Sequence, residues 1–123
     1  MARENIAALK YTVFADADIT LAVDTKIDTD IWNIHGDHFT VKSEDKNILS
    51  LETIENKIPI VLYENINGAD NHNELILKAG EEFTFTKLCW IYWGEKTVGS
   101  ADKFEQDSKA TFEELLTEHK AVW

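Results

Sequence analysis

The sequence has little that would cross-link a fold or mark a boundary between domains. It contains one cysteine, Cys89, so no disulfide can form within the chain. One proline, Pro59, and five scattered glycines leave no segment with the composition of a linker. No run approaches the ~18 apolar residues of a membrane span. We therefore expect one domain over residues 1–123, located in the cytoplasm and without contact with a membrane.

Positive charge is also scarce. The chain has 12 Lys and Arg against 23 Asp and Glu, and its formal net charge is −11. Such a surface repels phosphate backbones, so direct binding of nucleic acid is not expected. A basic protein surface or a cation would suit it better as a partner. The same charge also fits an acidic inhibitor that mimics nucleic acid and blocks a host enzyme.

Short segments with β-branched and aromatic residues recur along the chain, separated by turn-forming residues. Their number and spacing are typical of sandwiches and barrels. We therefore predict an all-β fold, an antiparallel β-sandwich or a jelly-roll-like barrel. The predicted strands are Lys10–Phe14, Ile19–Val23, Ile31–Ile34, Phe39–Val41, Asn47–Ile54, Ile58–Tyr63, Glu74–Leu77, Glu82–Thr86 and Leu88–Trp93.

The two ends of the chain differ from this pattern. Thr111 and Glu114 stand at the spacing of a capping box, and the apolar residues that follow have helical spacing. The sequence therefore predicts a short helix within residues 111–120, from Phe112 to Lys120. Residues 1–9 fit either a short helix or an N-terminal arm.

Motifs of catalysis are missing from the sequence. There is no Gly-x-Ser-x-Gly elbow, no phosphate-binding loop and no dinucleotide-binding glycine pattern. Cys89 lies inside a predicted strand, whereas reactive thiols prefer helix N-termini or electropositive pockets. These observations predict a protein that is not an enzyme and that needs no cofactor.

Two stretches are rich in oxygen ligands that calcium would accept. One holds five aspartates between residues 16 and 30, and the other is the loop from Gly68 to Glu74. Neither has the spacing of an EF-hand, and aspartate and asparagine are also ordinary turn residues. His35 and His38 lack the further ligands that a zinc site needs. The identity of any metal site stays unknown. The aspartates of the first stretch are Asp16, Asp18, Asp24, Asp28 and Asp30.

The strongest candidates for contact with another molecule are aromatic. In a strand, Trp90 and Tyr92 share one face, and Trp93 lies on the other. Trp123 ends the sequence and would be costly to leave in water. We predict that these four residues form an interface. The alternative is a carbohydrate-binding module, assisted by calcium, that uses Trp90, Trp93 and the Asp70–Asn71 loop.

Residues 74–94 resemble small β-sandwich virion proteins of tailed bacteriophages. The resemblance rests on the block Leu77–Phe85, with its Ala-Gly-Glu turn and Phe-x-Phe strand, and on Leu88 and Ile91–Tyr92. It implies a structural role in a capsid, connector or tail. We therefore predict a non-enzymatic assembly protein that acts through protein–protein contacts. It would form a homo-oligomer and would be found in the virion if the phage interpretation holds.

Overall fold

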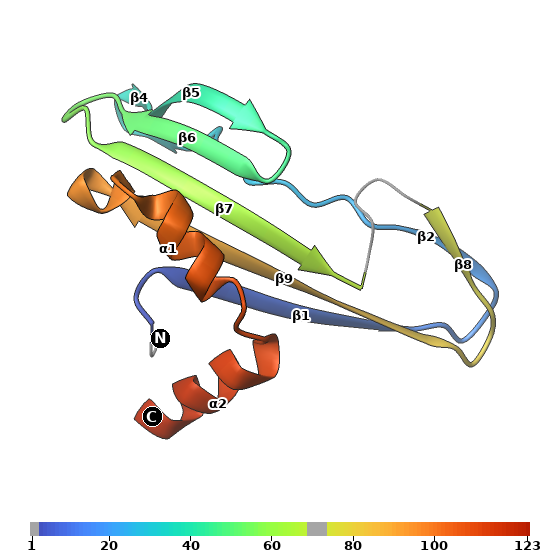
Figure 1. Cartoon of the computed structure of the whole chain (residues 1–123). Helices are drawn as coiled ribbons and strands as arrows, with labels where there is room; N and C mark the ends of the chain where they lie inside the picture. The colour runs from blue at the N-terminus through green and yellow to red at the C-terminus, as the bar shows by residue number, and fades with distance from the viewer. Residues whose placement is uncertain (1–2, 69–73) are drawn as a thin grey trace.

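The computed structural model describes residues 3–68 and 74–123 and consists mainly of antiparallel strands (Figure 1). Its main sheet has five strands in the order β1-β9-β7-β6-β5. Two helices, a 3₁₀ turn and two shorter strand pairs complete it. The predicted class, an antiparallel β-sandwich with a short C-terminal helix, is confirmed. The sheet strands are β1 (Ile6–Phe14), β5 (Phe39–Asp45), β6 (Ile48–Thr53), β7 (Pro59–Asn67) and β9 (Glu82–Trp93).

A second, smaller layer is formed by strands that continue from the main sheet. β2 (Ile19–Ala22) pairs with β8 (Glu74–Leu77). The register of this pair continues that of β1 with β9 without a shift, because the two residue numbers of each pair add up to 96 in both. The two pairs are therefore one antiparallel ribbon with a bend. At the bend, the Ala15 N–H donates to the Glu81 carbonyl at 2.9 Å, and Lys78 forms an ion pair with Asp18 at 2.8 Å.

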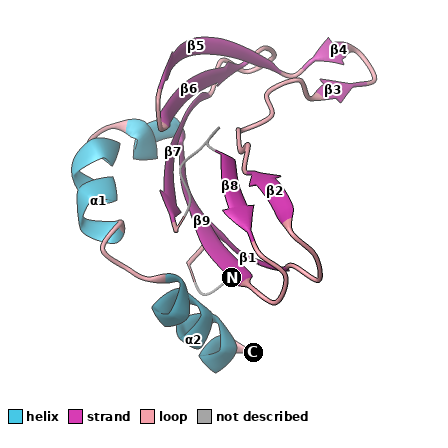
Figure 2. Ribbon diagram, turned by 90° about the vertical axis from the view of Figure 1, so that its right-hand side faces the viewer, coloured by secondary structure: helices cyan, strands magenta, loops and turns pink. Residues whose placement is uncertain are grey.

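Because of this bend, strands that are neighbours in the sequence do not form hairpins at the corner. The turns at residues 15–18 and 78–81 do not pair the strands that they join, because both turns lie at the corner of the same ribbon. Figure 2 shows the result: β2 and β8 lie on one side of the main sheet, and the helices lie on the other. The remaining strand pair, β3 (Trp32–Asn33) with β4 (Gly36–Asp37), extends from the same side as β2.

Two strands are longer than predicted. Glu82–Thr86 and Leu88–Trp93 are parts of the single strand β9, because Lys87 continues the ladder with β1 and β7. β1 begins at Ile6, so residues 6–9 belong to the sheet rather than to a helix or an arm.

The C-terminal part holds one helix that was predicted and one that was not. α2 (Phe112–Val122) is confirmed, with the Thr111–Glu114 capping box at its start. α1 (Ser100–Asp107) and the 3₁₀ turn Gly94–Thr97 were missed. In the part of the chain that the structure describes, no helix is long and apolar enough to span a membrane.

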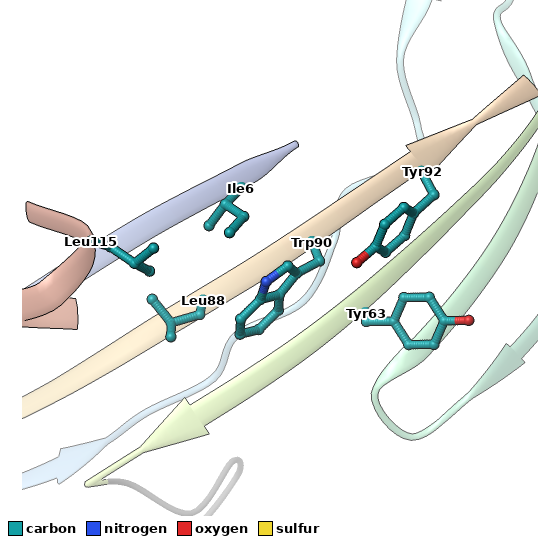
Figure 3. Packing of buried hydrophobic residues seen from close by; sticks show 6 residues of the cluster. All are labelled: Ile6, Tyr63, Leu88, Trp90, Tyr92 and Leu115. Carbon is teal, nitrogen blue, oxygen red and sulfur yellow. The ribbon is translucent and has the colours of Figure 1, made fainter. Parts of the chain in front are cut away.

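The first core lies between the main sheet and the helices (Figure 3). Trp90 and Tyr92 of β9 have no exposed surface. Phe104 of α1 stacks on Tyr63 at 4.5 Å between ring centroids and meets the Trp90 ring edge-on at 5.1 Å. Leu115 brings α2 onto the same cluster. Both helices are therefore held by one aromatic group on one face of the sheet.

The second core lies on the opposite face of the sheet. Leu49, Leu51 and Leu62 pack there with Cys89 and Ile91, which alternate with Trp90 and Tyr92 along β9. This face also carries a buried ion pair between Lys87 and Glu64, whose charged atoms lie 2.8 Å apart. Their side chains keep only 15% and 10% of their exposure. Each charge therefore depends on the other, because neither is well solvated.

Shortening Leu115 tests how α2 is attached. Leu115→Ala should lower the free energy of unfolding by about 2–4 kcal/mol, because it leaves a cavity in the first core. Leu116→Ala on the same helix is the matched control and should cost less than about 1 kcal/mol, because Leu116 is partly exposed. Urea unfolding monitored by tryptophan fluorescence measures both. Equal losses for the two variants would contradict the described packing.

The buried ion pair allows a double-mutant test. Lys87→Met alone should cost about 3–5 kcal/mol, because it leaves the Glu64 carboxylate buried without its cation. The double variant Lys87→Met with Glu64→Leu should be more stable than this single variant, since no charge remains in the apolar layer. Urea unfolding of Lys87→Met, Glu64→Leu and the double variant, compared with the wild type, gives the coupling energy of the pair. A double variant no more stable than Lys87→Met would argue against this arrangement.

Candidate docking surfaces

The structure separates the four aromatic residues that the sequence proposed as an interface. Trp90 and Tyr92 are enclosed within the first core, where they contact other residues of the same chain. Trp93 is partly exposed, and Lys96 lies over its ring at 4.5 Å. Trp123 is exposed at the end of α2, beside His119. Of the four, therefore, only Trp93 and Trp123 offer surface to another molecule.

Some of the proposed metal-ligating residues serve local structure. Asp18 accepts the backbone N–H of Ala79 and pairs with Lys78, and these contacts hold the pKa of Asp18 below its usual range. Asp28 accepts the backbone N–H of Asp30. Across residues 3–68 and 74–123, no three His, Cys, Asp or Glu side chains are grouped as a metal would require. The Asp70–Asn71 loop and His72 lie outside the described residues.

Two side chains in the interior, Cys89 and Tyr92, have raised pKa values that make them less reactive. Burial raises the pKa of the Cys89 thiol to about 11, and the Glu64 carboxylate acts in the same direction. Burial also raises the pKa of Tyr92 to about 12, and the charge of Asp107 adds to the effect. Both groups stay protonated at neutral pH. Cys89 therefore lacks the thiolate that nucleophilic chemistry needs.

The β3–β4 hairpin carries an exposed apolar group. Ile34 at its turn is 96% exposed, and Trp32 is 68% exposed. Ile31, just before β3, is also exposed. The Trp32 indole N–H donates to Asp30, which fixes one edge of the ring. Three exposed apolar side chains within four residues make the hairpin a candidate for contact with another molecule.

A second candidate is a pocket of about 220 Å³ between β1 and α2. Its floor is apolar, and a bidentate ion pair stands at its rim: the Arg3 guanidinium donates to both Glu118 oxygens at 2.8 and 2.7 Å. These hydrogen bonds from Arg3 hold the pKa of Glu118 below its usual range. Lys10 of β1 also pairs with Glu113 at the start of α2. The pocket is lined by Arg3, Ile6, Ala8, Phe112, Leu115, Leu116, Glu118 and His119.

Sequence reasoning missed both surfaces. Trp32 stood within a predicted strand, and nothing in the sequence marks that strand as a short exposed hairpin. The pocket depends on where α2 lies relative to β1, and these elements are about a hundred residues apart. The one signal that could have located the pocket is the pairing of Arg3 and Lys10 with acidic residues of the helix.

Comparison with known proteins gives one consistent answer. The model of the family described as glycosyl hydrolase family 65, N-terminal domain, matches residues 1–123. A 1,2-alpha-glucosylglycerol phosphorylase from Bacillus selenitireducens is 26% identical over 98% of this chain and 18% of its own length. A nigerose phosphorylase from Lachnoclostridium phytofermentans is 26% identical over 100% of this chain and 22% of its own length.

A solved structure has the same fold. The putative kojibiose phosphorylase from human microbiome superposes with a TM-score of 0.70 at 16% identity. The superposition covers 96% of this chain and 19% of the kojibiose phosphorylase chain. This chain therefore spans about a fifth of the length of the proteins that it matches.

These findings overturn several predictions. The resemblance of residues 74–94 to phage virion proteins is wrong, because that segment is turn chemistry and strand alternation that unrelated β-sandwiches share. The structural role in a virion and the virion location are wrong with it. The prediction that the protein is not an enzyme is contradicted by relatives named as phosphorylases. The carbohydrate-binding alternative came closer.

The match to the family model extends over every residue of the sequence, and the antiparallel fold agrees with it. The chain belongs to the glycosyl hydrolase family 65 N-terminal domain family.

Proposed function

We propose that this chain works as part of a family 65 phosphorylase that cleaves glucose-containing sugars with phosphate. The observation that carries this proposal is the match of the family model to residues 1–123, together with two relatives named for phosphorolysis. In such a reaction, a phosphate oxygen takes the place of the glycosidic oxygen at the sugar's anomeric carbon. The cytoplasm remains the proposed location, since a chain with one cysteine needs no oxidising compartment.

Within that enzyme, the proposed role of this chain is to support the remaining part through the β3–β4 hairpin. Ile31, Trp32 and Ile34 are exposed together, and each would gain by burial against another apolar surface. About four-fifths of each relative's own length lies outside the part that this chain matches, and that remaining part supplies a partner for the hairpin.

A chimera tests this role directly. Residues 1–123 would replace the matching segment of the nigerose phosphorylase, and release of glucose phosphate from nigerose would be measured. We expect the chimera to be active and a protein that lacks the segment to be inactive. Trp32→Ala combined with Ile34→Ser in the chimera should lower activity by about tenfold or more. Both side chains would be buried against the rest of the enzyme, and the double variant removes these contacts.

Ile76→Ser is the matched control, because Ile76 is similarly exposed but lies on β8, away from the hairpin. It should leave the activity of the chimera unchanged. A protein without the segment that is as active as the chimera would contradict a supporting role. Equal losses from the hairpin and the Ile76 variants would reject the hairpin as the contact.

A second candidate function is sugar binding by the chain itself, which one observation favours. The exposed Trp32 ring is held by Asp30, and an aromatic face beside a fixed carboxylate is an arrangement that can stack on a sugar ring and accept from its hydroxyls.

Calorimetric titration of the isolated chain with nigerose and kojibiose tests this second candidate. We expect weak binding that Trp32→Ala abolishes. Trp123→Ala is the control and should retain binding, since Trp123 lies at the end of α2. Absence of heat with the wild type rejects sugar binding by this chain and leaves the role in the enzyme untouched.

A further inference from the structure

The outer edge of β1 offers backbone groups that the sheet does not use. In the ladder with β9, the Ile91 N–H donates to the Asn5 carbonyl, and the Ala15 N–H donates to the Glu81 carbonyl. Odd-numbered residues of β1 therefore direct their backbone toward β9, and even-numbered residues direct it outward. A 2.8 Å bond between the side chains of Thr12 and Thr84 agrees, because such close side chains belong to pairs without backbone bonds.

The composition of β1 does not protect this edge. Edge strands in natural proteins are usually shielded by charge, proline or a bulge. β1 contains no acidic residue and no proline, and its one charge, Lys10, is paired with Glu113 of α2. Tyr11 and Phe14 are exposed. In a chain of net charge −11, this strand lacks the acidic side chains that would make two copies repel each other.

The pocket between β1 and α2 lies on the same side of the sheet as the even-numbered side chains of β1. Ala8 and Ile6 line it from the strand, and Leu115 and Leu116 line it from the helix. Phe14 points to this same side and is 64% exposed. The molecule therefore presents both an exposed phenyl ring and an apolar pocket able to accept one.

We propose that β1 pairs antiparallel with β1 of a second copy, in a register centred on Tyr11. Tyr11 then faces its own equivalent, Lys10 faces Thr12, and Ala8 faces Phe14. Directly opposed residues project to the same side of a sheet, so Phe14 of each copy enters the β1–α2 pocket of the other. The two main sheets become one continuous sheet. This proposal does not rest on the enzymatic role.

Neighbouring registers fit less well. Centring the pair on Lys10 places two lysines directly opposite each other, which is destabilising. Centring it on Thr12 shortens the overlap and moves Phe14 away from Ala8, the smallest side chain beside the pocket. The register on Tyr11 avoids both problems and also joins two aromatic rings across the new strand pair.

Light scattering and sedimentation of the 123-residue chain test the assembly. We expect twice the monomer mass of 14.1 kDa at micromolar concentration. Phe14→Ala should raise the dissociation constant by about tenfold or more. Thr12→Pro should abolish the dimer while the circular dichroism spectrum stays unchanged, because its N–H faces away from β9. Trp32→Ala, an exposed aromatic elsewhere, is the control and should leave the mass unchanged.

Cysteine cross-linking tests the register, in a Cys89→Ala background. Tyr11→Cys should form a disulfide-linked dimer with oxidised glutathione, because the two Cα atoms would lie ~4.5 Å apart. Leu9→Cys should not cross-link with itself but should cross-link with Val13→Cys. A monomer at all concentrations overturns the proposal. So does a dimer that survives Thr12→Pro, or one in which Tyr11→Cys fails to cross-link.

Discussion

The structure depends on the burial of β9 on both of its faces. Trp90 and Tyr92 fill one side, and Cys89 and Ile91 fill the other, so a single sheet in water could not hold this strand. The first side requires α1, whose Phe104 contacts the Trp90 ring. The second side requires a covering layer, to which Ile27 contributes from the segment that follows β2. The layers on both sides of the sheet are therefore needed for the same reason, which is to bury the two apolar faces of β9.

Charge is arranged around the same strand. Lys87 of β9 lies diagonally across the ladder from Glu64 of β7, which is directly opposite Cys89, and the two charges neutralise each other inside the second core. The remaining acidity lies outside, where Glu113 and Glu118 bind Lys10 and Arg3 and tie α2 to the N-terminal part of the chain. Because these outer pairs are exposed, they fix the orientation of α2 more than they stabilise the fold. The stabilising apolar contact of the helix comes from Leu115. The helix is thereby held beside β1, where it forms the pocket.

Local signals predicted what depends on local chemistry. Alternation identified most strands, and the Thr111–Glu114 capping box identified α2. α1 was not predicted because it begins after Gly99 with no side-chain cap. Its eight residues also contain a single large apolar side chain, Phe104. Strand partners could not be inferred, because both turns at the ribbon corner look like hairpin turns. The aromatic residues proposed as an interface were chosen by type alone, and burial of Trp90 and Tyr92 is decided by α1, which was not predicted.

The two proposed contacts use opposite ends of the molecule. β1 is one edge of the five-stranded sheet, while the hairpin lies near the other, where the Ile54 N–H donates to the His38 carbonyl beside β4 (Figure 1). Pairing through β1 therefore leaves Trp32 and Ile34 free. In a symmetric dimer the two hairpins would stand at the far ends of one continuous sheet, each able to contact its own partner. A single acidic domain could thus join two copies at an edge strand without acidic residues and still support an enzyme at the opposite edge.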